Sequence, residues 1–149
     1  MQVHQFYPTA AYGDAASDQM LGLQRLLRRR GYRSEIFCAR LPLHYQGRTR
    51  QISAYERYSS PDTILLLHYS MAYSPEVLAW LERIPDRKVL VYHNITPHQF
   101  FAGIDARYFR EARAGRQQLR RLLALTEAGW GVSEYNCQEL AAHGWDRLG

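Results

Sequence analysis

A continuous apolar run from Thr63 to Leu67, directly behind the turn residues Pro61 and Asp62, constrains the fold more than any other feature of the sequence. Strands that are buried on both faces have this pattern, and they occur almost only in parallel sheets that helices cover. A second run of this kind, Lys88–Tyr92, follows after one intervening helical pattern. We therefore expect an α/β protein with a buried sheet.

Strand and helix patterns alternate along the whole chain. Strands are predicted at Gln2–Tyr7, Ser34–Ala39, Thr63–Leu67, Lys88–Tyr92 and Trp130–Ser133. Helices are predicted from Asp14 to Gly31, Ser74 to about Arg83, Phe109 to Leu125 and Ser133 to about His143. The stretch Pro42–Arg57 is predicted to be a long loop with a short strand near Ile52. This alternation predicts one domain over residues 1–149, with a mostly parallel sheet and helices on both of its faces.

The helix boundaries have specific signals. Asp14 is a residue type that caps helices, and Gly31 is a residue type that ends them. Pro75, behind Ser74, occupies a first helical position, where proline is favoured. In the first helix, one stripe of apolar residues is expected to face the core: Ala16, Met20, Leu23 and Leu27.

The charge balance is basic, with 19 lysines and arginines against 14 acidic residues and a net charge of +5. Such a surface favours anionic partners, which include phosphates, nucleotides, anionic lipids and nucleic acids. No apolar run approaches the ~20 residues that a membrane span needs. Cys38 and Cys137 form no Cys-x-x-Cys pair, which fits a reducing compartment. We expect a cytoplasmic protein, with peripheral attachment to the inner face of the plasma membrane as a further option.

The predicted helix Phe109–Leu125 has two contrasting sides. Five arginines cluster opposite its apolar side: Arg110, Arg113, Arg116, Arg120 and Arg121. One interpretation is a solvated basic face on a core-packed helix. The other is a surface that an anionic membrane attracts. Nucleic acid is not expected as a partner, because the sequence has no aromatic-rich strand motif and no DNA-binding helix pair.

Polar residues follow the predicted strands, at the edge of a parallel sheet where ligands bind. They are Gly13 and Asp14; His68, Tyr69 and Ser70; His93, Asn94 and Thr96; and Ser133 and Glu134. At such a place His93 can bond a hydroxyl group or carry a proton, and Gly13 lets an anion approach a helix start. The plain alternatives are a histidine satisfied by nearby backbone and an ordinary turn glycine.

A metal site is not expected. His68, His93 and His98 lie in neighbouring segments, but the sequence has no His-x-x-x-His pair on a helix and no carboxylate at ligand spacing beside them. We therefore expect the protein to work without a bound metal.

Four stretches of the chain carry a resemblance to a known family. They are His4–Tyr7 with Gly13–Ala15, Leu67–Ser70, Tyr92–Pro97 with Phe100 and Phe101, and Val132–Asn136. Together they resemble the amino-terminal half of the family-four glycosyltransferases, especially those of O-antigen and other bacterial surface polysaccharides. The Tyr-His-Asn-Ile-Thr-Pro stretch is the most specific of the four.

The resemblance implies the GT-B fold, in which two Rossmann-like domains face each other across a cleft. This chain would be the three-layer Rossmann-like domain on the acceptor side. The whole protein would move a hexose, such as mannose, from a nucleotide sugar to a lipid-linked or oligosaccharide acceptor. The anomeric configuration would be retained, without a metal or other cofactor.

The resemblance also assigns roles to the candidate residues. His93 would position and stabilise the transferred sugar as the catalytic residue. The donor diphosphate and sugar would be contacted by Gly13, Asp14, Asn94 and Thr96. The acceptor would be contacted by His68, Tyr69, Ser70, Ser133 and Glu134.

The family's carboxyl-terminal donor domain, with its paired glutamates, has no counterpart in this sequence. A transition state with charge developing on a diphosphate needs such preorganised positive groups. We therefore expect no turnover by this chain alone. Two alternatives stay open: a stand-alone Rossmann-like module that binds a carbohydrate or nucleotide without catalysis, and a basic protein that binds membrane or nucleic acid through the arginine helix.

Overall fold

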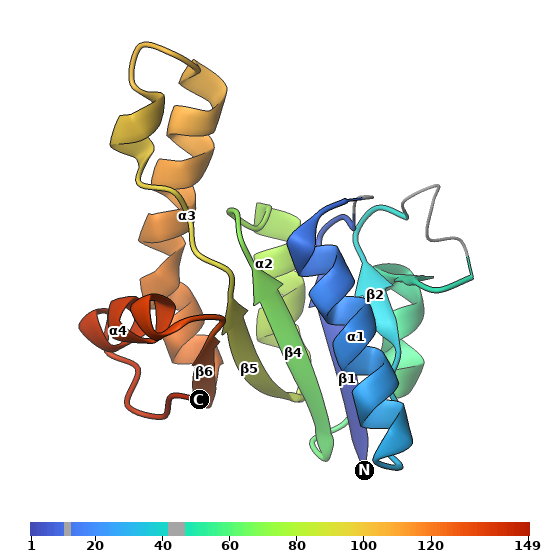
Figure 1. Ribbon diagram of the computed structural model, residues 1–149. Coiled ribbons are helices and arrows are strands. Elements are labelled where there is room, and N and C mark those ends of the chain that lie inside the picture. Colours follow the sequence, from blue (N-terminus) through green and yellow to red (C-terminus); the bar gives the residue numbers. More distant parts are fainter. Residues whose placement is uncertain (11–12, 42–46) are drawn as a thin grey trace.

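A single six-stranded sheet forms the centre of the computed structural model, which describes residues 1–10, 13–41 and 47–149 (Figure 1). Every neighbouring pair of strands is parallel, in the order β3-β2-β1-β4-β5-β6. The strands are β1 (Gln2–Tyr7), β2 (Ile36–Cys38), β3 (Arg50–Gln51), β4 (Thr63–Tyr69), β5 (Arg87–Tyr92) and β6 (Ala128–Gly131). The predicted α/β, Rossmann-like fold is confirmed.

The strand order reverses between β1 and β4. From β1 the chain moves outward through β2 to β3, then returns to the other side of β1 and continues through β5 to β6. Open parallel sheets bind ligands at such a switch point, in the crevice outside the carboxyl ends of the strands. In this chain the switch point lies where Tyr7 and Tyr69 end β1 and β4.

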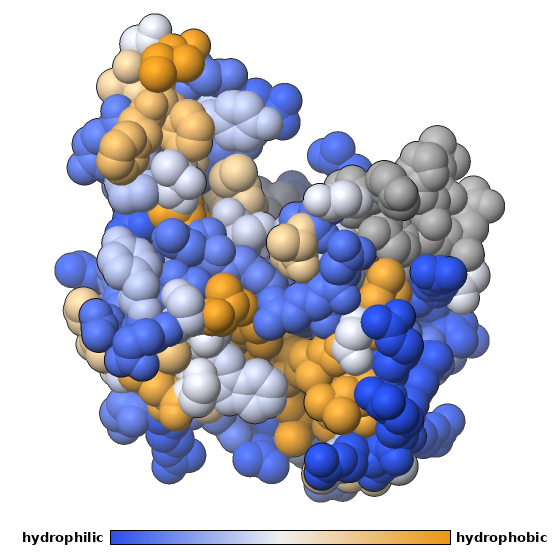
Figure 2. Space-filling view, in the orientation of Figure 1, coloured by the Kyte–Doolittle hydropathy of each residue, from blue (hydrophilic) through white to orange (hydrophobic). Residues whose placement is uncertain are grey.

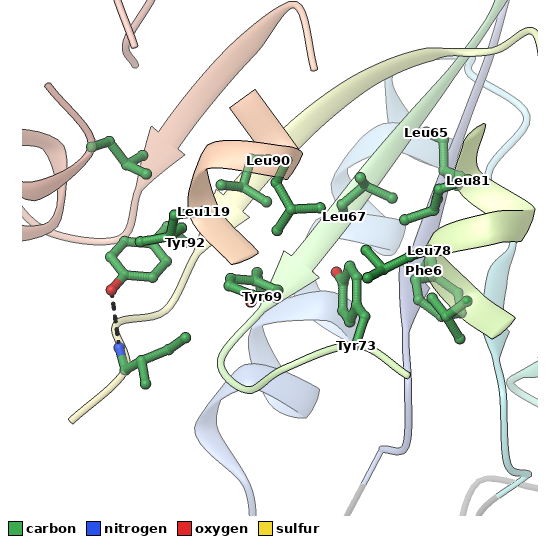
Figure 3. Close-up of a cluster of buried hydrophobic side chains, with 14 of the residues drawn as sticks. Phe6, Leu65, Leu67, Tyr69, Tyr73, Leu78, Leu81, Leu90, Tyr92 and Leu119 are labelled. Atoms are coloured by element: carbon green, nitrogen blue, oxygen red, sulfur yellow. Dashed lines mark hydrogen bonds between the residues drawn. The ribbon is translucent and has the colours of Figure 1, made fainter. Parts of the chain in front are cut away.

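Helices cover both faces of the sheet. They are α1 (Ala15–Arg29), α2 (Pro75–Arg83), α3 (Ala106–Leu125) and α4 (Glu134–Ala142), with 3₁₀ helices η2 (Ile52–Tyr58) and η3 (His98–Phe101). Leu23 and Leu27 of α1 pack on one face, against a small cluster around Leu66. The main core lies on the other face, where α2 and α3 pack against Leu67 and Leu90 (Figure 3).

Three of the predicted helix starts are confirmed by their capping contacts. The Asp14 side chain accepts hydrogen bonds from the first-turn N–H groups of Ala16 and Ser17. Ser74 caps α2 and Ser133 caps α4 in the same way. These side chains satisfy backbone donors that have no partner within the helix.

Some boundaries differ from the sequence-based expectation. β4 extends to Tyr69, so His68 and Tyr69 are strand residues. β6 begins at Ala128, two residues before the predicted Trp130, and α3 begins at Ala106, capped by Asp105. Apolar periodicity alone missed these ends because they are defined by a capping aspartate and by pairing with a neighbouring strand. Of the predicted Pro42–Arg57 loop, residues 42–46 lie outside the described part of the chain; the rest contains β3 and η2.

The amino-terminal part of α3 and η3 together project beyond the sheet (Figure 1). They stand on the side to which the carboxyl ends of the central strands point. The rings of Phe101 and Tyr108 stack within this helical hairpin, with centroids 5.6 Å apart, and His98 packs edge-on against Phe109. None of the described helices is long and apolar enough to cross a membrane.

Candidate functional site

A hydrogen-bonded row of side chains runs through the sheet beside the switch point. Gln5 of β1, His68 of β4 and His93, directly after β5, lie on three neighbouring strands. Gln5 Oε1 lies 2.9 Å from His68 Nε2, and His68 Nδ1 lies 2.9 Å from His93 Nε2. Gln5 and His68 are buried, whereas His93 is partly exposed. The row therefore connects the interior of the protein to a surface histidine.

The row defines the proton positions on both histidines. Gln5 Nε2 donates to the Met20 carbonyl, 3.1 Å away, so Gln5 Oε1 is the acceptor that faces His68. His68 Nε2 must then donate, and neutral His68 has only a lone pair at Nδ1. His93 Nε2–H donates a hydrogen bond to that lone pair. Neutral His93 is thereby left with a lone pair on Nδ1, which has no hydrogen-bond partner among the described residues.

Burial keeps both histidines of the row neutral. Desolvation lowers the pKa of His68 to about 3, with a further contribution from the neighbouring His93. Burial also lowers the pKa of His93, and the negative charge of Asp14 opposes that change. At neutral pH, His93 therefore offers a hydrogen-bond acceptor at Nδ1 rather than a positive charge.

The buried histidines predict acid sensitivity. Desolvation lowers the pKa of His4 to about 4, as it lowers that of His68 to about 3, both from 6.5. Below pH 6.5 the unfolded chain binds protons at these sites that the folded chain does not. As the pH falls below 6.5, the unfolding free energy should therefore decrease by ~1.4 kcal/mol per pH unit for each of the two histidines.

Urea unfolding at several pH values from neutrality down to about 5 measures this slope. His68→Gln should remove the contribution of one histidine from the slope. His143→Gln, at the end of α4, is the matched control and should leave the slope unchanged. The same slope in His68→Gln as in the parent chain would contradict the prediction.

Asn94 has two features that mark a functional position. Its φ of +73° makes it the only residue other than glycine with a left-handed backbone in the described ranges. Its side-chain Oδ1 is buried and has no hydrogen-bond partner among the described residues. Strained backbone and unsatisfied buried acceptors are concentrated at binding sites. The residue next to His93 therefore carries a buried acceptor that no described residue satisfies.

A cavity of about 380 Å³ lies at the switch point. Tyr7, at the end of β1, and Ser70, just after β4, line it, and their hydroxyl oxygens are 2.9 Å apart. Arg40, two residues after β2, and Arg107, in the first turn of α3, line it as well, and Arg107 also pairs with Glu111. Figure 2 shows the surface hollowed beside the projecting hairpin. The cavity combines hydroxyl groups and positive charge, which suits a polar, partly anionic ligand.

Gly13 and Asp14 lie at the start of α1, close enough for Asp14 to act electrostatically on His93. Gly13 has a φ of +74°, and no described residue lies within 4 Å of the position that a Cβ would occupy. The Asp14 carboxylate already accepts from the first-turn amides and from the Ser17 hydroxyl, at 2.7 Å. A diphosphate at this helix end would have to displace that carboxylate.

The other predicted acceptor and donor residues are placed differently. Tyr69 is buried and points toward α3, where its hydroxyl donates to the Gly115 carbonyl at 2.7 Å. Successive strand residues face opposite sides of a sheet, so Tyr69 and His68 do not share a side. Ser133 caps α4, while Glu134 and Thr96 are exposed. The structure brings together His68, His93, Asn94 and Asp14, but not Tyr69 with them.

The five arginines of α3 do not form one free basic face. Arg116 is partly buried, pairs with Glu139 of α4 and donates to the Ile95 carbonyl at 2.6 Å. Arg121 pairs with Glu82 of α2. The others, Arg110, Arg113 and Arg120, are exposed and have no ion pair among the described residues.

The roles of Gln5, Tyr7, Arg40 and Arg107 were not predicted from the sequence. For Gln5 a signal existed, because His4 and Gln5 are adjacent polar residues inside a strand of a sheet predicted to be covered on both faces. A buried polar side chain needs a partner, and this one could have been sought on the neighbouring strands. Within the described ranges, no group of three or more His, Cys, Asp or Glu side chains is arranged to hold a metal ion.

Comparison with known proteins does not assign the chain to a family. No model of a known protein family matches it, and a search of curated proteins finds no match either. The function must therefore be inferred from the residues of the site and their geometry.

Proposed function

We propose that this chain is the acceptor-side domain of a glycosyltransferase that moves a hexose from a nucleotide sugar to a lipid-linked or oligosaccharide acceptor. The observation that carries the proposal is the row Gln5–His68–His93, which ends in an unpaired acceptor on His93 beside the switch point of a Rossmann-like sheet. The resemblance of the Tyr92–Pro97 stretch to family-four glycosyltransferases supports it.

In this proposal His93 acts on the sugar rather than as a nucleophile. Its Nδ1 accepts a hydrogen bond from a sugar hydroxyl, and the buried row keeps that lone pair correctly placed. Asn94 Oδ1, which is buried and unpaired among the described residues, would accept a second hydrogen bond once the sugar binds. Acceptors that are already oriented cost no reorganisation when charge develops during transfer. The cavity lined by Tyr7 and Ser70 would hold the acceptor beside the sugar.

Binding to the chain tests the proposal directly. We expect millimolar GDP-mannose or UDP-glucose to shift the backbone NMR signals of Gly13, His93 and Asn94. His93→Ala should remove the part of the effect that depends on the sugar, so that nucleotide sugar and plain nucleoside diphosphate then behave alike. His143→Ala is the matched control and should bind as the parent chain does.

The outcomes separate the candidate functions. Nucleotide-sugar binding at these residues, with transfer in the complete protein, supports the transferase. The same binding without transfer to any acceptor supports the alternative of a carbohydrate- or nucleotide-binding module. Signals that shift elsewhere, or nowhere, would overturn the proposed site.

A further inference from the structure

The tip of the projecting hairpin exposes large apolar side chains to solvent. Phe100 of η3 is 71% exposed, Ile104 of the following turn is 82% exposed, and Tyr108 of α3 is 47% exposed. They adjoin a shallow apolar hollow whose lining includes Ala102, Gly103 and Phe109. We call Phe100, Ile104 and Tyr108 the apolar tip. Exposed apolar residues that gather at one projecting end mark an interaction site rather than ordinary surface.

Positive charge flanks the apolar tip. Arg110 and Arg113, one and two turns along α3, are exposed and have no ion pair among the described residues. Figure 2 shows hydrophobic residues at the end of the hairpin with hydrophilic residues below them. Apolar and aromatic side chains bordered by arginines match the boundary between the acyl chains and anionic headgroups of a bilayer. A protein partner would have to supply a matching acidic rim.

The apolar tip lies on the same side of the sheet as the cavity. The hairpin rises on the side of the carboxyl ends of the central strands, the side on which Tyr7, Ser70 and Arg107 line the cavity (Figure 1). If the tip enters a bilayer, this edge of the sheet faces the membrane surface. A headgroup attached to a lipid can then reach the cavity without leaving the membrane.

We propose that the apolar tip inserts into the interface of an anionic lipid bilayer, while Arg110 and Arg113 bind its headgroups. Of the five arginines of α3, the proposed membrane-binding surface therefore includes only those in the amino-terminal part, Arg110 and Arg113. Arg116 is excluded because it is paired inside the protein. The inference does not rest on sugar transfer, since membrane binding is measured without any substrate.

Co-sedimentation with vesicles tests the proposal. We expect the chain to bind vesicles of equimolar phosphatidylglycerol and phosphatidylcholine, but to bind pure phosphatidylcholine weakly. Phe100→Ser with Ile104→Ser should lower the affinity for the anionic vesicles about tenfold or more. Arg110→Glu with Arg113→Glu should lower it by a similar factor, and added salt should weaken binding by the parent chain.

Matched controls and a direct readout complete the test. Leu26→Ser on α1, another exposed apolar residue, and Arg25→Glu with Arg29→Glu should bind as the parent chain does. In Ile104→Trp, tryptophan fluorescence should shift to the blue with anionic vesicles and be quenched by brominated lipid. Equal binding by the tip variants and the parent chain would overturn the proposal. So would a dimer, seen by sedimentation velocity without lipid, that the tip variants abolish.

Discussion

In the proposed transferase, replacing His93 with alanine is expected to lower turnover about a hundredfold, with a smaller change in the Michaelis constant for the donor. Loss of one preorganised contact to the reacting group has an effect of this size. A contact that is stronger in the transition state than in the ground state acts on kcat more than on binding. Initial rates with a radiolabelled nucleotide sugar would measure both constants.

The control for this prediction is His143→Ala, at the carboxyl end of α4 and away from the His68–His93 pair. It should leave both constants unchanged. Transfer activity of His93→Ala at the level of the parent protein would remove His93 from the proposed site. A change confined to the Michaelis constant would make His93 a residue for substrate binding alone.

Replacing Glu139 with alanine is expected to destabilise the fold by about 3 kcal/mol. The side chain of Glu139 is 10% exposed and pairs with Arg116, whose side chain is 25% exposed. Removing one partner leaves the other charge largely buried and unpaired, which costs ~3–5 kcal/mol in most proteins. Glu139 also accepts a hydrogen bond from the Tyr92 hydroxyl at 2.8 Å. The unfolding midpoint in urea gives the change.

Two further variants show whether the cost comes from the unpaired charge. Arg116→Leu together with Glu139→Leu removes both charges and should recover most of the stability, because a buried ion pair can often be replaced by apolar residues. Glu134→Ala, an exposed glutamate in the first turn of α4, should leave stability nearly unchanged. A loss below about 0.5 kcal/mol in Glu139→Ala, the range of ordinary surface changes, would contradict the prediction.

The same network supports the candidate site. The Tyr92 hydroxyl (Figure 3), which donates to Glu139, accepts from the Ile95 backbone N–H at 3.2 Å. Arg116 donates to the Ile95 carbonyl. Ile95 follows His93 and Asn94. Side chains of α3 and α4 therefore fix the loop that carries the unpaired acceptor atoms of His93 and Asn94. Glu139→Ala should therefore also shift the backbone NMR signals of His93 and Asn94.

Local sequence determined the elements of this protein and their order. The apolar run Thr63–Leu67 favours a covered sheet, because its apolar side chains point to both faces of the strand and both faces must be shielded from water. The caps at Asp14, Ser74 and Ser133 were readable because a capping side chain contacts a backbone only a few residues away. The placement of His93 at the end of a buried strand followed from the same local pattern.

Only the tertiary structure decided which of the polar residues act together. Gln5 and His68 are 63 residues apart, and they meet because β1 and β4 are paired in the register that aligns Gln5 with Leu66. Arg116 looked like part of a solvated basic face, yet α4 brings Glu139 to it and makes the pair structural. Periodicity reports which side of a helix is buried, but a partner from a distant segment is fixed by strand register and helix packing, which no local pattern contains.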